Sequence, residues 1–295
     1  MNSKQQTVNS KRNQKHLKGR VMQITHYGVR GSIPAPGLDT VGFGGNTTCV
    51  EVVTSKGQRL IIDCGTGIRK LGLNLLKEKD VTEIPIFVTH VHWDHIQGLP
   101  FFLPIYMSRF KLRFLGAKES FGRLYSTLYD QMDGYVFPAK LQEVQSNINY
   151  QVVDDEGFNL GEMHCDIIRN NHPVPTYWVK IHDSGKTFCF LTDNELNIDK
   201  PQTEYKKFVE FCAGADLLIH DAQYTEDDMK KTRGWGHSTF LEVIKLAEDA
   251  GVKSLGFHHH DPERNDQQLE QIIGEIRANT KIHIFGAREG EKLEV

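Results

Sequence analysis

The sequence predicts a layered α/β domain in which sheets are covered by helices. Short apolar runs typical of buried strands come first and then alternate with segments whose apolar residues recur at helical spacing. The chain has 295 residues, 39% of them hydrophobic, which is enough for a sizeable core. Residues 21–295 contain no Ser/Gly run, Pro tract or internal repeat. We therefore expect residues 21–295 to form one domain.

The first third of the chain is rich in predicted strands. Alternating or continuous apolar residues predict strands at 21–28, 49–54 and 59–65. Helical spacing of apolar residues predicts a helix at 68–78. An apolar run bounded by Pro85 and a group of histidines predicts a further strand at 84–90.

Strands and helices then alternate to the end of the chain. The same criteria predict strands at 111–117, 164–172, 176–182, 187–193, 216–222 and 254–260. They predict helices at 120–132, 204–215, 238–252 and 266–279. Ser238 is the expected N-cap of the third of these helices.

The charge of the chain is unevenly distributed. Residues 1–20 carry six basic residues and no acidic one, so this segment is +6 and the rest is −3 − 6 = −9. The polar composition of residues 1–20 predicts a disordered tail, and this segment lacks the apolar stretch of a secretory signal peptide.

No segment of the chain approaches the roughly 18 apolar residues that span a membrane. The five cysteines form no CxxC pair, which favours reduced, buried thiols in a cytoplasmic protein.

Four potential metal ligands crowd together directly after a predicted strand. The stretch FVTHVHWDHIQGLPFF (87–102) contains His90, His92, Asp94 and His95. Imidazole and carboxylate groups are suited to Zn²⁺ and neighbouring transition metals. Two histidines two positions apart on an extended segment share one face, so His90 and His92 can reach one ion. A turn after them can direct Asp94 and His95 to a second ion, so the pattern predicts a metal site rather than surface histidines.

Further polar residues lie at or just past the ends of other predicted strands. In layered α/β folds, sites are commonly assembled at strand ends, because the strands fix positions and the loops supply freedom. The residues with this placement are His90, His172, Asp193, Asp221 and His259.

Together these motifs resemble the signature of the metallo-β-lactamase superfamily. THVHWDHIQGLPFF is similar to its first metal-binding motif, NHP (171–173) to its next histidine, LTD (191–193) to its bridging aspartate and HHHDP (258–262) to its last histidine. IDCGTG (62–67) resembles the strand end whose aspartate supports the first motif. The resemblance spans about residues 21–285. It implies a four-layer αββα sandwich that holds two metal ions at one edge of its packed sheets.

The resemblance also implies a set of metal ligands. They fall into three groups: His90, His92 and His172 for one ion, Asp94, His95 and His259 for the other, and Asp193 shared by both. In the run His258–His260 only one side chain is expected to face inward, and the match at HHDP favours His259. Zn²⁺ is the expected metal, with Mn²⁺ as the alternative.

Other stretches resemble the ribonuclease Z and cyclic-phosphodiesterase branch of the superfamily. They are GVRGSIPAPGLDTVGFGGNTTCVEV (28–52), LLIHDAQYT and RGWGHSTFLEV (233–243). In ribonuclease Z-like enzymes an acid and the histidine of GHS pair beside the metals, which implies that role for Asp221 and His237. The acid is usually glutamate there, and this chain shows no Gly/Pro-rich arm of the kind that grips transfer RNA. Both departures argue against transfer-RNA processing, whereas hydrolysis of a phosphodiester is still the implied reaction.

The implied function is a dinuclear metal-dependent phosphodiesterase acting on a small or cyclic nucleotide. The implied nucleophile is a metal-bridging hydroxide oriented by Asp94, and His237, supported by Asp221, is the implied general acid. A hydrolase of thioesters or lactams, an RNA-processing endonuclease and a non-catalytic binding protein are the alternatives. The last is disfavoured because all seven expected ligand positions hold competent ligands. Homodimerisation and a nucleic-acid partner stay open.

Several residues are candidates for substrate contacts. The Gly-rich opening loop supplies hydrogen-bond donors that could hold a phosphate, among them Arg30, Ser32 and Asn46. Tyr177 and Trp235 adjoin site motifs and are candidates for stacking on a base. Trp93 is expected to pack in the interior instead.

Overall fold

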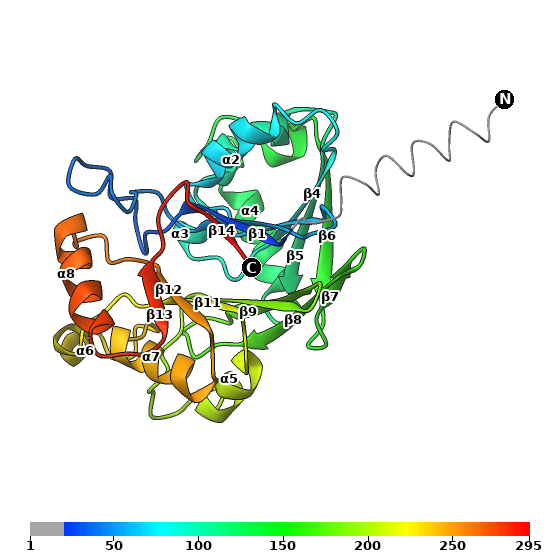
Figure 1. Cartoon of the computed structure of the whole chain (residues 1–295). Coiled ribbons are helices and arrows are strands. Elements are labelled where there is room, and N and C mark those ends of the chain that lie inside the picture. Colours follow the sequence, from blue (N-terminus) through cyan, green and yellow to red (C-terminus); the bar gives the residue numbers. More distant parts are fainter. Residues whose placement is uncertain (1–20) are drawn as a thin grey trace.

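The computed structural model describes residues 21–295, so the predicted basic tail at 1–20 lies outside the described residues. Two seven-stranded sheets pack face to face, and helices cover the outer face of each (Figure 1). The strand order is β14-β1-β2-β3-β4-β5-β6 in the first sheet and β13-β12-β11-β10-β9-β8-β7 in the second. This is the four-layer αββα sandwich that the sequence resemblance implied.

The first sheet is built from the first half of the chain and its last strand. Its strands are β1 (Gln23–Gly28), β2 (Cys49–Val53), β3 (Arg59–Ile62), β4 (Glu83–Phe87), β5 (Lys111–Ala117), β6 (Asn147–Val153) and β14 (Lys292–Glu294). Strands β3 to β6 run parallel, whereas β14, β1 and β2 pair antiparallel. The helices of this half are α2 (Ile68–Leu75), α3 (Trp93–Ile96), α4 (Phe121–Asp130) and the 3₁₀ turns η1 (Leu99–Phe101), η2 (Leu103–Tyr106) and η3 (Leu141–Glu143).

The second sheet comes from the second half of the chain. Its strands are β7 (Phe158–Leu160), β8 (Met163–Arg169), β9 (Tyr177–Asp183), β10 (Lys186–Leu191), β11 (Leu217–Asp221), β12 (Ser254–His258) and β13 (His283–Gly286). Strands β10 to β13 run parallel, and β7, β8 and β9 pair antiparallel. The helices are α5 (Tyr205–Cys212), α6 (Glu226–Thr232), α7 (Phe240–Asp249) and α8 (Asp266–Arg277).

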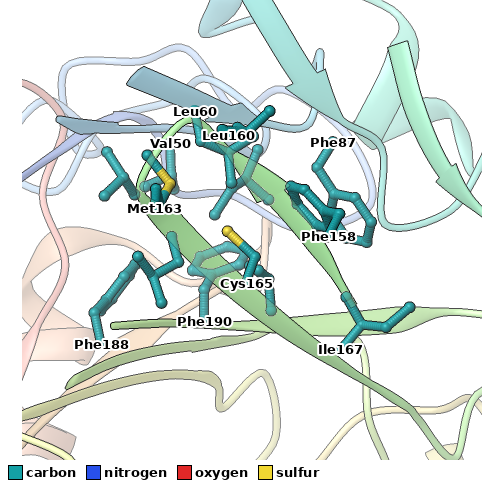
Figure 2. Packing of buried hydrophobic residues seen from close by; sticks show 14 of the residues in the cluster. Val50, Leu60, Phe87, Phe158, Leu160, Met163, Cys165, Ile167, Phe188 and Phe190 are labelled. Carbon is teal, nitrogen blue, oxygen red and sulfur yellow. The ribbon is translucent and has the colours of Figure 1, made fainter. Parts of the chain in front are cut away.

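The main core lies between the two sheets. Alternate side chains of each sheet point into this layer, as strand geometry requires. Figure 2 shows Val50, Leu60 and Phe87 from the first sheet against Phe188 and Phe190 from the second. Burying each such side chain contributes roughly 1.5–3 kcal/mol. Two further clusters join each sheet to its own helices, so the layers are held together and the strand ends are fixed.

Most elements match their predicted ranges within a few residues, and the differences have local causes. The helix predicted at 238–252 is α7, and it is capped by Thr239 rather than Ser238. The Thr239 side chain accepts a hydrogen bond from the backbone N–H of Glu242, whereas the Ser238 hydroxyl donates to the backbone carbonyl of Asn194. Strand β6, the short strands β7, β13 and β14 and the helix α6 were not predicted. The five cysteines are buried and unpaired. Within residues 21–295 no helix is both long and apolar enough to span a bilayer.

The direction of the strands brings the predicted site residues to one edge. Strands β3 and β4 run parallel, and so do β10, β11 and β12. Strand β8 shares the direction of β10, because both are antiparallel to β9. The carboxyl ends of these strands, which carry the predicted site residues, therefore lie at a common edge of their sheets.

Candidate active site

Seven side chains at this edge form two overlapping groups of potential metal ligands. Within each group the ligand atoms lie within 4.8 Å of one another. The first group is His90, His92, His172 and Asp193, and the second is Asp94, His95, His259 and Asp193. These are the two sets that the sequence resemblance implied, with Asp193 common to both.

The loop after β4 supplies four of the seven residues, and it is held by Asp63 at the end of β3. One carboxylate oxygen of Asp63 accepts from the backbone N–H of Thr89 at 2.8 Å, and the other is 2.8 Å from Nδ1 of His95. An Nδ1–H that donates to this carboxylate leaves the His95 Nε2 lone pair free for a cation. Asp63 therefore fixes both the position and the tautomer of His95.

The loops of the second sheet supply the remaining three residues, each oriented by a neighbour. His172 places Nδ1 3.0 Å from the backbone carbonyl of Gly236, and His259 places Nδ1 2.9 Å from Oε1 of Gln223. Both contacts turn the Nε2 atoms toward the cluster. The Nε2 atom of His259 lies 3.0 Å from Asp94 and 3.3 Å from Asp193.

Backbone strain is concentrated at this site. Among residues 21–295, five residues other than glycine have a positive φ, and four of them belong to the cluster or adjoin it: Ser32, Asp63, Asp193 and His259. Such left-handed conformations are uncommon for non-glycine residues and cluster at functional sites. Asp63 and Asp193 follow the ends of β3 and β10, and His259 follows β12. In each case the left-handed residue ends the extended backbone and turns the chain at the sheet edge.

The geometry and chemistry of the cluster fit divalent cations. The Nε2 atoms of His90 and His95 are buried and have no hydrogen-bond partner within the described residues. Ligands about 2.0–2.1 Å from a tetrahedral Zn²⁺ lie about 3.3 Å from one another. The carboxylates of Asp94 and Asp193 approach the imidazoles of the cluster at 3.0–3.6 Å. A cation between these groups would satisfy the orphaned nitrogens.

Burial keeps two of the histidines in the form that can bind a metal. It lowers the pKa of His172 to about 4 and that of His90 well below its ordinary value. Because only neutral imidazole has a free lone pair for a metal, both side chains are available as ligands at neutral pH. Burial would raise the pKa of Asp193, but His259, His95 and His90 hold it well below the usual range, so this carboxylate is ionised.

The family model described as "Beta-lactamase superfamily domain" matches residues 58–260, which include all seven clustered residues. The chain belongs to the beta-lactamase superfamily. Among the curated proteins, ribonuclease Z of Haloferax volcanii is 24% identical over 323 residues, covering 93% of this chain and 95% of that protein.

Two solved structures share the fold of this chain. The metallo-beta-lactamase fold protein YhfI from Bacillus subtilis aligns with a TM-score of 0.70 and 19% identity, covering 93% of this chain and 100% of that one. A diphosphatase from the PhnP family aligns with a TM-score of 0.68 and 19% identity, covering 93% and 98%.

A histidine–carboxylate pair adjoins the cluster of this superfamily member. Nδ1 of His237 lies 3.2 Å from Oδ2 of Asp221, and the His237 ring stacks on that of His259 with centroids 4.8 Å apart. Burial alone would raise the pKa of Asp221, but hydrogen bonds from His220 and His237 lower it below its usual value. The carboxylate therefore engages Nδ1 of His237 and leaves Nε2 as the nitrogen that is free to act elsewhere.

The structure places two of the five predicted substrate contacts in the interior. Arg30 is fully buried and donates to the backbone carbonyls of Gly44, Asp261 and Arg264, so its role is structural. Tyr177 is the first residue of β9, with 6% of its surface exposed. Local sequence could not reveal either burial, because the covering segments are distant in the chain.

The other three predicted contacts have different placements. The backbone N–H of Ser32 donates to Oδ2 of Asp94 at 2.8 Å, so Ser32 adjoins the cluster. Asn46 is held by the carboxylate of Glu289. Trp235 is 61% exposed, two residues before His237. Trp93, expected in the interior, is instead 76% exposed next to His92, because it starts the short helix α3 at the surface.

The sequence did not indicate several residues that orient the cluster. Gln223 is one, although a signal was present: it lies two positions after Asp221, and such residues share a face at the end of a strand. Gly31 is another, because a Cβ there would lie 2.2 Å from Nδ1 of His259. Glycine is required at this close approach.

The three consecutive histidines should behave differently when each is replaced by alanine. We expect His259→Ala to lose metal, because Nε2 of His259 alone faces the cluster. His258 and His260 bond to the backbone carbonyls of Gly28 and Ala287, so their replacement should keep metal content and lower stability by about 1–3 kcal/mol. Elemental analysis and thermal unfolding of the three variants measure this. Metal loss confined to His258→Ala would contradict the assignment.

Proposed function

We propose that this superfamily member hydrolyses a small nucleotide phosphodiester, cyclic or linear, at the clustered histidines and aspartates. The chain is a metal-dependent hydrolase of the phosphodiesterase type, in line with relatives named ribonuclease Z and a related fold named as a diphosphatase. The observation that carries the phosphodiester chemistry is the Asp221–His237 pair beside the cluster. The proposed small size of the substrate rests on the charge around the site.

The pair has a task in phosphodiester hydrolysis, RNA processing included, that it lacks in thioester hydrolysis. When a nucleotide diester is cleaved, a poorly stabilised alkoxide leaves, and a nearby acid must protonate it. His237, supported by ionised Asp221, can donate that proton from Nε2. A thiolate released from a thioester needs much less protonation, so the pair would have no clear role there.

The remaining side chains would bind the cations and shape the site. His90, His92 and His172 would hold one cation and Asp94, His95 and His259 the other, with Asp193 common to both. Two divalent cations held there would activate water and neutralise charge on the phosphoryl oxygens. Asp94 is fixed by the N–H of Ser32, so it is placed to orient the attacking group.

The charge around the site favours a small substrate over a long RNA. Proteins bind nucleic-acid backbones through lysine and arginine side chains that contact phosphates. Four arginines adjoin the site loops in the sequence, and within residues 21–295 each has protein partners: Arg30, Arg169, Arg233 and Arg264. The exposed side chains at the site include the indoles of Trp93 and Trp235, which could stack on a base, and the amine of Lys200, which lines a pocket with His172.

RNA processing is the second candidate, because the curated relatives are named ribonuclease Z. The two candidates predict different substrate preferences. A precursor transfer RNA would be the preferred substrate of an RNA-processing enzyme, and binding would weaken steeply with salt. A small-nucleotide phosphodiesterase would favour cyclic or dinucleotide substrates and show weak salt dependence.

The proposal also includes the cellular compartment and the metal. We infer that residues 21–295 act as one domain in the cytoplasm, where the five buried thiols stay reduced. Zn²⁺ is the proposed metal, with Mn²⁺ as the alternative, because the ligands are imidazoles and carboxylates.

Metal analysis combined with a substrate screen tests the proposed function. We expect close to two ions per chain and hydrolysis of bis-p-nitrophenyl phosphate together with a cyclic or linear small nucleotide. The same preparation is assayed against precursor transfer RNA, a thioester and a lactam. A chain that neither carries nor takes up Zn²⁺ or Mn²⁺ would rule out the metal-dependent mechanism, and a strong preference for the RNA would favour the second candidate.

A further inference from the structure

A buried carboxylate outside the cluster connects two of the loops that carry site residues. Glu195 lies two residues after Asp193 and is fully buried. Its Oε2 accepts hydrogen bonds from the backbone N–H groups of Gly234 at 2.8 Å and Gly236 at 3.2 Å. Its Oε1 lies 3.5 Å from the guanidinium of Arg233. One side chain therefore binds three residues of the segment that leads into His237.

The turn at residues 233–236, which Glu195 binds, contains two glycines and is therefore intrinsically flexible. Gly234 and Gly236 have φ of +86° and +88°, a region that favours glycine. Glycine is also the residue whose backbone loses most conformational freedom on ordering. A Cβ at position 236 would lie 2.1 Å from Nδ1 of His172, so the turn packs directly against a site histidine. The two N–H bonds to Glu195 oppose the flexibility that the glycines bring.

Two residues of the proposed mechanism depend on this turn. The carbonyl of Gly236 lies 3.0 Å from Nδ1 of His172 and so fixes the tautomer that directs Nε2 to the cluster. The next residue in the chain is His237, whose Nδ1 faces Asp221. A shift of the turn would move both imidazoles at once. The same two loops meet again beyond the turn, where the Ser238 hydroxyl donates to the Asn194 carbonyl and accepts from the Leu196 N–H. Neither of these bonds involves residues 233–236, which Glu195 binds.

We propose that Glu195 is a positioning residue that locks the 233–236 turn and thereby sets the orientation of both His172 and His237. The inference rests on the proposed function for its kinetic part only. Through this one carboxylate, the orientation of His172, a ligand of the first cation group, is coupled to that of His237, the proposed general acid.

Zinc binding tests the first half of the inference without any substrate. We expect Glu195→Ala to weaken one of two Zn²⁺ sites by about 10–100-fold, the range typical when a group that orients a ligand is lost, and to leave the other site unchanged. Glu195→Gln should retain most of the affinity, because the amide oxygen still accepts both N–H bonds. Titration of the metal-free full chain with Zn²⁺ against a competing chelator measures both affinities.

Glu51→Ala is the matched control. Glu51 is another buried glutamate facing an arginine, Arg59 at 2.8 Å, but it lies on β2 in the other sheet. It should keep both Zn²⁺ affinities even if it lowers the melting temperature. If Glu195→Ala keeps both affinities, or weakens both sites to the extent that Glu51→Ala does, the turn does not depend on Glu195 in the way proposed.

Kinetics at saturating Zn²⁺ test the second half. Glu195→Ala should slow hydrolysis of a nucleotide diester more than that of a p-nitrophenyl ester, because only the former needs protonation of its leaving group. In a His237→Ala background, Glu195→Ala should not further change the ratio of the rates on the two substrates. If the effects of the two substitutions on this ratio are fully additive, Glu195 does not act through His237. If the protein hydrolyses no phosphodiester, the proposed function fails, and the zinc titration still decides whether Glu195 orients His172.

Discussion

Asp193→Ala is expected to lose metal from both groups and to lose more activity than any single histidine variant. Asp193 is the only residue common to the two groups within the described chain, and its two carboxylate oxygens face different imidazoles. Loss of a group that merely orients a ligand costs about 10–100-fold in affinity or activity, so loss of a shared ligand should exceed about 100-fold. Metal content and the rate of diester hydrolysis are the measurements.

Two companion variants separate ligand loss from strain. Asp193 has a φ of +57°, a conformation that asparagine tolerates better than alanine. Asp193→Asn should therefore fold like the wild type and still bind metal poorly, because the amide carries no charge. Asp199→Ala removes an exposed carboxylate from the same loop and should change neither property. An Asp193→Ala variant with both ions and full activity would show that this carboxylate is not shared.

His237→Ala should slow a nucleotide diester by about 10²–10⁴-fold, the usual contribution of general acid catalysis. A p-nitrophenyl ester leaves as a stable phenolate and should be slowed much less. Metal content should not change, because His237 belongs to neither ligand group. The ratio of the two rates, measured with each variant at saturating metal, isolates proton donation from binding.

Asp221→Asn should show the same asymmetry in milder form, because it weakens the support for a protonated His237 without removing the imidazole. His283→Ala, which replaces an exposed histidine on β13, is the control and should leave both rates unchanged. Equal slowing of the two substrates by His237→Ala would assign this residue to binding or structure, and unchanged rates would remove it from the mechanism.

The sequence predicted those parts of the protein that local pattern determines. Apolar runs and helical spacing indicated most strands and helices, and the polar residues at strand ends indicated which side chains would meet. The sequence did not predict features that depend on contacts between residues distant in the chain. Arg30 is buried by the segment around Asp261, and the roles of Gln223 and Glu195 exist only once loops from separate strands pack together.

The run His258–His260 shows why strand alternation alone could not identify which histidine faces the cluster. All three side chains are buried, so alternation between an inner and an outer face does not distinguish them. The strand ends at His258, and the left-handed backbone at His259 turns that imidazole toward the cluster. This turn depends on the conformation of one residue, which composition and spacing do not specify.

The division of the sheets along the chain has a consequence for biosynthesis. Strands β1 to β6 are made before β7 to β13, and each set forms a separate sheet. A nascent chain therefore displays His90, His92, Asp94 and His95 on one loop while the opposite half of the site does not yet exist. His259 follows β12, and β14, which pairs with β1, lies further along the chain. The two groups of ligands are complete only after His259 has been made, so an ion held by the first loop alone would have fewer protein ligands and would still be exchangeable on the ribosome.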